Sequence, residues 1–491
     1  MTDGQNALAN SPFGKLSTEL LIKILERARP DDIFDVYKKK YSIQNDPTQE
    51  YQAQEYPTQK YPTLLALVCR SWREVVLGVP TFWSNIYIVE NCAKEMKAAR
   101  INLRHSGTTV PLFLTWFSMA VQFDAEPQQV IDEFVIPYRD RWQRITLHTD
   151  EDNLADNLHV AMASIDFRVL QVLEIRCASS KSPPSGPALC HSAPLLRLCR
   201  LYYIPSLPPI PSNLVVLDYA QGAPLDLDPL LEFLHHVAHS LEHLRFISPT
   251  SNVSVTPREF RVTLQNLKTL LIEDSHDIME HILAPNLTYF SVRYRIAPAM
   301  QKVANMFHGF EAPKLQSIRF SGTPLQPLLR SCHFPSTFPL LKSAVFEGCG
   351  DESAIIKFLE PSENQKAENA FPELEELAIS NLADPTSLQA AIEKRLKNGG
   401  KSLRMIHLPE GDETRSRQLC MPIPPELQDD FFNEDLDLFD VIREWFECEE
   451  GDGGDEMMER GEEEMMEGIE EDNEDEEDED EGAEGDGFYD V

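Results

Sequence analysis

The stretch Leu267-Lys-Thr-Leu-Leu-Ile272 contains a pattern that governs most of the chain: a leucine, two variable residues, and apolar residues at alternate positions after them. The pattern, often with a proline two residues ahead of it, begins at residues 142, 170, 196, 214, 241, 267, 287, 315, 341, 374 and 403, although the units at Trp142 and Leu196 fit it more loosely. Most intervals between these eleven positions are 26 to 29 residues. Because alternate side chains of a strand point to opposite faces, each unit predicts one short strand with an apolar side.

This period is typical of leucine-rich repeats, whose units are roughly 20–29 residues long. One unit cannot cover its own apolar side, so neighbouring units stack and share a core. The predicted fold class is therefore α/β, with an irregular leucine-rich-repeat solenoid over residues 138–410. It is irregular because the units lack the asparagine that marks regular repeats. Residues 228–243 and 297–307 are the clearest candidate helices, and an α/β domain of unrelated strands is the alternative.

The residues between the inward positions are expected to face the concave side of such a solenoid. Arg200, Arg245 and Arg319, together with Arg293 directly after its strand, make this side basic. A basic surface suits an acidic or phosphorylated segment of a protein substrate. The alternative is an ordinary strand face whose arginines pair with the chain's own acids.

Two segments near the N-terminus carry apolar residues at helical spacing, in residues 16–27 and 64–77. The first can be capped by Ser17 or Thr18. Residues 31–61 between them are polar and repeat a five-residue unit around Tyr51, Tyr56 and Tyr61. This composition has too little aliphatic surface to offset chain entropy, so a mobile insertion is predicted.

Three motifs here resemble an F-box of the kind seen in many basidiomycete fungal proteins. They are Leu16-Ser-Thr-Glu-Leu-Leu-Ile-Lys-Ile-Leu25, Leu67-Val-Cys-Arg-Ser-Trp-Arg-Glu-Val75 and Pro80-Thr-Phe-Trp-Ser-Asn-Ile86. The resemblance covers roughly residues 13–88. The chain departs from the family in having Ser17 where proline is usual, and in carrying the insertion.

The resemblance implies a helical module that docks on the adaptor subunit of an SCF-type cullin–RING ubiquitin ligase, while the rest of the chain captures a substrate. The adaptor-binding residues that it implies are Leu16, Glu19, Leu20, Leu21, Ile24, Leu25, Val68, Cys69 and Trp72. The alternative is that these apolar residues form only the core of an N-terminal helical cap. Residues 89–137 are expected to connect the module to the repeats or to cap the first repeat.

The acidity of the chain is concentrated at its C-terminus. The 491 residues carry a net charge of −37, of which residues 449–491 supply −23 and residues 423–448 supply −8. Residues 449–491 are predicted to be a disordered acidic tail. Residues 423–448 form an amphipathic acidic segment that could dock on the last repeat or bind a partner. The nearly neutral remainder lacks the basic face that nucleic acid requires.

Several other functions are excluded or disfavoured. The chain has no secretory signal at its start and no apolar run long enough to cross a membrane, so a cytoplasmic or nuclear location is expected. Its nine cysteines form no CxxC pair. His235 and His239 are one helical turn apart but lack the glutamate of a zinc protease motif.

With no nucleotide-binding loop or nucleophile motif either, no catalytic centre, cofactor or metal is expected. The leading hypothesis is a ligase adaptor that recruits an unidentified protein substrate. The alternatives are a repeat scaffold outside any ligase and an acidic-tailed chaperone of basic proteins.

Overall fold

The structure is a computed structural model that describes about half of the chain, and all of these residues belong to the larger of its two compact units, residues 1–33 and 51–424. The described residues are 17–27, 61–89, 93–118, 127–149, 165–177, 193–203, 213–221, 227–248, 261–274, 277–294, 312–323, 338–349, 355–356, 359, 371–380, 385–397 and 401–408. The predicted insertion up to residue 60, the candidate helix 297–307, and segments 423–448 and 449–491 lie outside these ranges.

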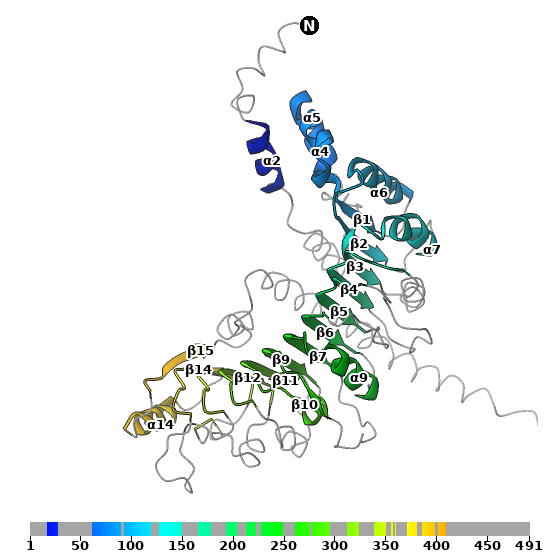
Figure 1. Cartoon of the computed structure of the whole chain (residues 1–491). Coiled ribbons are helices and arrows are strands. Elements are labelled where there is room, and N and C mark those ends of the chain that lie inside the picture. The colour runs from blue at the N-terminus through cyan, green and yellow to red at the C-terminus, as the bar shows by residue number, and fades with distance from the viewer. Residues whose placement is uncertain are drawn as a thin grey trace, which may run out of the picture. The chain divides into compact units, whose positions relative to one another are not determined.

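The described repeats form one sheet of thirteen strands, all parallel and in chain order (Figure 1). The strands are β1 (Asn85–Val89), β2 (Leu112–Ser118), β3 (Trp142–Thr149), β4 (Val172–Cys177), β5 (Leu198–Tyr202), β6 (Val216–Ala220), β7 (His243–Ile247), β9 (Thr269–Glu273), β11 (Tyr289–Arg293), β12 (Ser317–Ser321), β13 (Ser343–Glu347), β14 (Glu376–Ser380) and β15 (Arg404–Leu408). Two short strands, β8 (Val262–Thr263) and β10 (Ile282–Leu283), pair separately.

Each of the eleven predicted units supplies one strand of this sheet, from β3 to β15 without β8 and β10, which confirms the repeat-built parallel sheet. Two further strands, β1 and β2, precede them. β1 has no leading leucine, and in β2 the core residues Leu114 and Trp116 follow Leu112 after two and four positions rather than the three and five of the repeat. Neither strand therefore matches the pattern on which the prediction rests. β1 begins at Asn85, so the sheet starts within the range expected for the helical module, and β2 lies in the expected connecting region.

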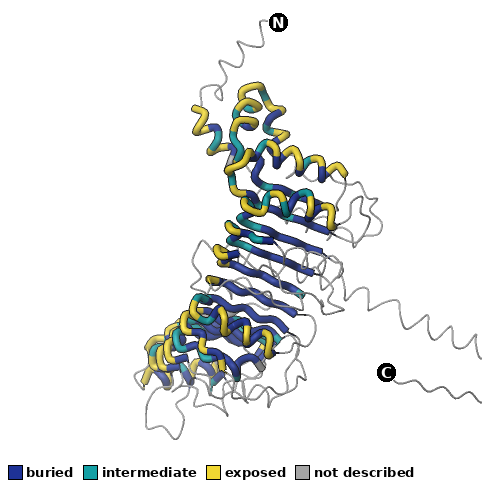
Figure 2. The backbone as a smooth tube through the Cα atoms, turned by 45° about the vertical axis from the view of Figure 1, so that its right-hand side comes forward, coloured by how far each residue is buried: buried dark blue, intermediate teal, exposed yellow. Residues whose placement is uncertain are grey.

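The core lies on one side of the sheet. Alternate residues of the strands face it, as Leu270 and Ile272 do in β9. The central strands β4, β5, β6, β7 and β9 are buried along nearly their whole length (Figure 2). Three helices contribute apolar residues to the same core: α6 (Ala93–His105), α9 (Leu227–Val237) and α14 (Pro385–Lys397). The shorter helical segments are α7 (Pro127–Val130), η3 (Ile131–Val135), η4 (Ile136–Tyr138) and η5 (Asp277–His281).

Asparagines directly before three of the leading leucines join consecutive repeats. Asn213 donates a side-chain hydrogen bond to the carbonyl oxygen of Pro194 at 3.2 Å, and Asn286 donates one to Gln265 at 2.7 Å. Asn266 bonds the carbonyl of His239 in the same way. Each bond satisfies a backbone carbonyl oxygen in a turn, where the hydrogen bonds between strands do not reach. It thereby fixes the spacing between neighbouring turns.

The N-terminal helices have a small core of their own. They are α2 (Thr18–Arg27), α4 (Tyr61–Val68) and α5 (Arg70–Gly78), followed by the 3-10 turn η2 (Pro80–Trp83). Their buried residues are Leu21, Leu25, Ala66, Val76, Phe82 and Trp83. The indole nitrogen of Trp83 donates to the carbonyl of Val76 at 2.8 Å, which ties η2 to α5.

The caps of these helices follow from polar residues at their starts. The Ser17 hydroxyl accepts a bond from the Leu20 backbone N–H at 3.3 Å, as predicted for the first helix. The segment expected as one helix over residues 64–77 is two, because Cys69 is extended, with φ −159° and ψ 171°. Its Sγ accepts from the Trp72 backbone N–H at 3.5 Å and caps α5.

Candidate protein-binding surfaces

Helix α2 has two apolar sides. Leu21 and Leu25, four residues apart, are 4% and 1% exposed and belong to the N-terminal core. Leu20 and Ile24, also four residues apart, are 52% and 43% exposed. A helix in a soluble protein normally needs only one apolar side, so the second side of α2 is available for a partner.

Exposed apolar side chains gather in this part of the chain. Of the ten large hydrophobic residues that are exposed among those described, six lie in α2, α4 and α5. We call five of them, on α2 and α4, the N-terminal apolar residues: Leu20, Ile24, Leu64, Leu67 and Val68. Residues 64, 67 and 68 are three and four positions apart and therefore share one face of α4.

The adaptor-binding residues implied by the F-box resemblance fall into three groups. Glu19, Leu20, Ile24 and Val68 are exposed, whereas Cys69 and Trp72 are half-buried. Leu21 and Leu25 lie inside the module's own core, where they stabilise it. Leu16 lies outside the described residues.

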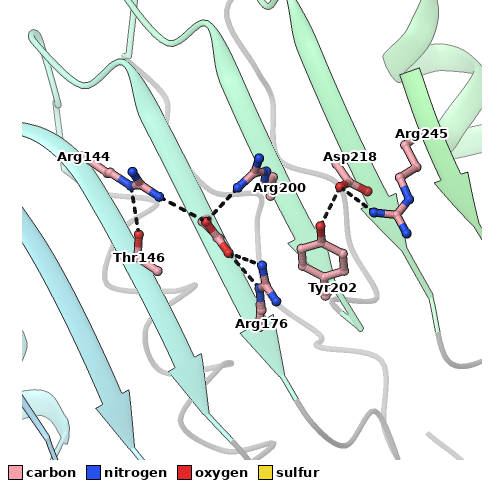
Figure 3. A network of polar contacts seen from close by, with 8 residues as sticks. Arg144, Thr146, Arg176, Arg200, Tyr202, Asp218 and Arg245 are labelled. Atoms are coloured by element: carbon pink, nitrogen blue, oxygen red, sulfur yellow. Dashed lines mark hydrogen bonds and ion pairs between the residues drawn. The ribbon is translucent and has the colours of Figure 1, made fainter. Parts of the chain in front are cut away.

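The second candidate surface is the side of the sheet that faces away from the core. We call it the polar face. It consists of the first, third and fifth residues of the five-residue segment of each strand that pairs with its neighbours, for example Val172, Glu174 and Arg176 in β4. At its centre Glu174 of β4 is surrounded by three arginines from three adjacent strands (Figure 3). We call these four residues the cationic cluster: Arg144, Glu174, Arg176 and Arg200.

The contacts in the cationic cluster are unequal. Arg176 approaches one carboxylate oxygen of Glu174 with two nitrogens, Nε at 2.7 Å and Nη2 at 2.6 Å. Arg200 and Arg144 share the other oxygen at 3.4 and 3.8 Å. Only Arg176 therefore makes a close pair with the carboxylate.

The charge state of Glu174 is set by these neighbours. Burial alone would raise the pKa of its carboxyl group. The positive charges of Arg176 and Arg200, with smaller effects of His148 and Arg144, outweigh burial and hold this pKa well below its usual value. Glu174 is therefore ionised at any physiological pH.

A second group of ion pairs continues the polar face across β5, β6, β7 and β9. Arg245 bridges Asp218 at 3.5 Å and Glu273 at 3.0 Å. The Tyr202 hydroxyl donates to the same oxygen of Asp218 at 2.5 Å (Figure 3). Further along, Arg319 pairs with Glu347 at 2.6 Å.

The four arginines predicted for substrate binding all occupy this face of the sheet. Arg200, Arg245 and Arg319 hold the third position of their strands, and Arg293 holds the fifth position of β11 rather than following it. The first three pair with the chain's own carboxylates, which was the alternative left open by the sequence. They are almost completely buried.

Aromatic rings accompany the charges on the polar face. The guanidinium group of Arg176 lies 4.7 Å from the ring centroid of Tyr202, and the rings of Phe117 and His148 stack at 4.6 Å. Arginines beside aromatic rings can bind carboxylates and apolar side chains of one ligand together.

Sequence reasoning missed several members of this network, including Arg144, Glu174 and Asp218. They occupy the polar-face positions of β3, β4 and β6, and the register aligns Glu174 with Arg200 and Asp218 with Arg245. Aligning the predicted strands on their leading leucines would have placed these residues side by side. The sequence left open that the arginines pair with acids of the chain, but it did not identify which acids these are.

Other types of site gain no support from the described residues. No group of three or more His, Cys, Asp or Glu among them is arranged to hold a metal ion. His235 and His236 lie at the end of α9, and their rings meet edge to face. None of the helices described is both long and apolar enough to span a bilayer.

Comparison with known proteins gives a match only among solved structures. No family model matches it, and no curated protein matches its sequence. Among solved structures, it is similar to a crystal structure of an internalin (inlF) from Listeria monocytogenes, with 12% identity and a TM-score of 0.27 over 80% of this chain and 94% of that one. The repeated architecture of this chain is evident from the in-register pairing of its parallel strands.

Proposed function

We propose that this chain is a substrate-recruiting adaptor of an SCF-type cullin–RING ubiquitin ligase. In this proposal the N-terminal helices bind the adaptor subunit of the ligase, and the repeat sheet binds a protein substrate. The chain itself performs no catalysis, and neither nucleic acid nor a membrane is a partner. It works in the cytoplasm, the nucleus or both.

The observation that carries the proposal is the second apolar side of α2. Leu20 and Ile24 are exposed although Leu21 and Leu25 of the same helix already supply the local core. Leu64, Leu67 and Val68 add exposed apolar surface on α4. Burying such side chains against partner helices is favourable by about 25 cal/mol per Å² of apolar area. The resemblance of these helices to an F-box indicates that the partner is the adaptor subunit of the ligase.

The repeat sheet supports the recruiting half of the proposal. Stacked repeats commonly form a long surface that binds a ligand. Holding a substrate beside a ligase raises its local concentration there without any chemistry by the recruiting chain. A repeat scaffold outside any ligase uses the same sheet but needs no exposed residues on α2.

The test is binding of the full chain to the purified adaptor subunit, measured by calorimetry. We expect micromolar or tighter binding that is lost in the double variant Leu20→Asp with Ile24→Asp. The matched control is Leu195→Asp with Leu340→Asp, which replaces two equally exposed leucines on the repeat sheet's turns. This control should bind like the unchanged chain.

The double variant must also keep its fold, which circular dichroism and thermal unfolding report. Undiminished binding by Leu20→Asp with Ile24→Asp would refute the assigned interface. Absence of binding by the unchanged chain would favour the scaffold over the ligase adaptor.

A further inference from the structure

Helix α6 exposes charged side chains of one sign only. The helix connects β1 to β2 (Figure 1), and it buries Met96, Ala99 and Leu103 in the core. The residues on its opposite side lie three and four positions apart and therefore share one face. We call this side the basic face, and its exposed residues are Lys94, Lys97, Ile101 and Arg104.

The positive charge of the basic face is not balanced within α6. The single acid of the helix, Glu95, is only 7% exposed and lies on the buried side. At the margin of the face, Arg100 donates to both carboxylate oxygens of Glu133 in η3, with Nη2 at 2.8 Å from Oε2. Lys97 and Arg104, in contrast, have neither an ion pair nor a side-chain hydrogen bond with any residue that the structure describes.

The other two helices that pack on the core do not share this pattern. The exposed side of α9 carries the acids Asp228 and Glu232, and that of α14 carries Glu393 beside Lys394. Like charges three or four positions apart destabilise a helix slightly. Because a solvated helix face does not require a single sign of charge, an anionic ligand explains the basic face better than solvation does.

The size and composition of the basic face limit this ligand. From Lys94 to Arg104 the helix advances ten residues, or about 15 Å, which equals about five residues of an extended peptide. Proteins that bind nucleic acid strongly contact about 6–10 phosphates, so three cations are too few. Ile101, at 40% exposure, is too little apolar surface for a membrane-bound helix. A short protein segment with carboxylates on both sides of an apolar residue fits the face.

We propose that the basic face of α6 binds an acidic segment of a partner protein. Carboxylates of the segment pair with Lys97 and Arg104, and an apolar side chain between them covers Ile101. His105, which follows directly, has its ring centroid 4.6 Å from that of Trp83 in η2, so α6 adjoins the N-terminal helices. A partner that also binds elsewhere on this chain gains a second attachment point, which raises the overall affinity.

The test uses the full chain and a fluorescent peptide made of four Glu-Glu-Leu units, with a peptide of four Gln-Gln-Leu units as its control. Fluorescence anisotropy measures the binding of both. We expect the acidic peptide to bind at least tenfold more tightly than the amide peptide, and raising the salt concentration should weaken its binding. The variant Leu20→Asp with Ile24→Asp should bind the acidic peptide like the unchanged chain, so this proposal can succeed or fail separately from the ligase role.

Two matched double charge reversals locate the site. Lys97→Glu with Arg104→Glu changes the basic face, and Lys397→Glu with Arg197→Glu is the control. Each pair combines a lysine and an arginine that are exposed and have no ion pair within the described ranges. The first variant should weaken binding of the acidic peptide at least tenfold, and the control less than twofold. Lys97→Gln with Arg104→Gln, which removes two charges and adds none, should weaken it at least threefold and covers the case in which the reversal does not fold.

Three outcomes would overturn the proposal. The first is an acidic peptide that does not bind or binds no better than the amide peptide. The second is an equal loss of binding in the two double reversals. The third is tighter binding of a single-stranded DNA of twelve nucleotides, or of phosphatidylserine vesicles, than of the acidic peptide, since the basic face would then serve a nucleic acid or a membrane.

Discussion

Glu174 is the residue on which the polar face depends most. It is completely buried, and its carboxylate contacts arginines from three adjacent strands. Removing one partner of a buried ion pair leaves charges without compensation, which costs about 3–5 kcal/mol. Replacing Glu174 should therefore be far more harmful than replacing an exposed acid.

We predict that Glu174→Gln lowers the free energy of unfolding by about 3–5 kcal/mol at neutral pH, measured by urea titration. Asp166→Asn is the control, since its partner Arg168 is 73% exposed, and such a pair contributes about 1 kcal/mol or less. Equal effects of the two substitutions would contradict the central role of Glu174.

The same substitution should show a defined pH dependence. The pKa of the Glu174 carboxyl group is lower in the folded chain than in the unfolded chain, where it is near 4.5. The ionised carboxylate therefore stabilises the fold at pH values above about 4.5. This contribution is lost as the pH falls through and below that value. The stability difference between the unchanged chain and Glu174→Gln should therefore shrink below about pH 4.5.

Gly322 is a second residue with a specific role, because two repeats approach each other closely there. Its φ is +62°, and a Cβ placed on it would lie 2.1 Å from the carbonyl oxygen of Tyr294. Gly348 has a similar φ of +56°, but its nearest neighbour would be 3.9 Å away. The two glycines share the backbone conformation and differ in the space around them.

We predict that Gly348→Ala destabilises the chain by about 1–2 kcal/mol, the usual cost of a left-handed conformation in an L-residue. Gly322→Ala should cost clearly more, since the backbone of Tyr294 has to move as well. Denaturant unfolding of the two variants compares them directly. A Gly322→Ala variant no less stable than Gly348→Ala would contradict the close approach.

The sequence predicted which arginines occupy the polar face but not what they contact. Arg200, Arg245 and Arg319 follow from the alternation of side chains along a strand. Their carboxylate partners lie 26 to 28 residues away in the chain. Such pairs depend on the register of neighbouring strands, which becomes visible only when the repeats are stacked.

At the scale of elements, helix α2 performs two tasks with two pairs of residues. Leu21 and Leu25 hold it to the N-terminal core, and Leu20 and Ile24 remain exposed on it. Spacing alone predicted the helix and its cap but put all four residues on one face. The packing of α4, α5 and η2 against α2 decides which pair is buried.

Substitutions that lower stability and substitutions that lower binding should therefore affect different residues of α2. We predict that Leu25→Ala lowers the free energy of unfolding of the N-terminal helices by about 2–5 kcal/mol. Leu20→Ala should change it by less than about 0.5 kcal/mol, as is usual for an exposed position. Hydrogen exchange of the full chain at increasing urea concentration, followed in α2, α4 and α5, measures both losses. Similar losses in both variants would contradict the two-sided helix.

Strands β1 and β2 could not be predicted from the repeat pattern. Ten of the eleven predicted strands start with the leucine-led unit and β3 starts with its looser form at Trp142, whereas β1 and β2 do not match the spacing of the unit. Ile86 and Ile88, and likewise Leu114 and Trp116, fill the core positions of their strands. A short alternating segment is too common in sequences to identify a strand without its neighbours.

At the scale of the whole molecule, the proposed functions lie in different parts of the chain. Exposed apolar side chains gather in the N-terminal helices, whereas buried charge gathers on the sheet's polar face. Most of the net negative charge follows the last strand in the sequence. This division lets a partner bind the N-terminal helices without disturbing the sheet.

The measurement that tests the central claim most directly is hydrogen exchange of the full chain, with and without the purified ligase adaptor subunit. The account predicts slower exchange in α2 and α4, which carry the N-terminal apolar residues, and unchanged exchange in β3 to β15. Unchanged exchange throughout, or protection confined to the sheet, would contradict the claim that α2 and α4 form the docking site.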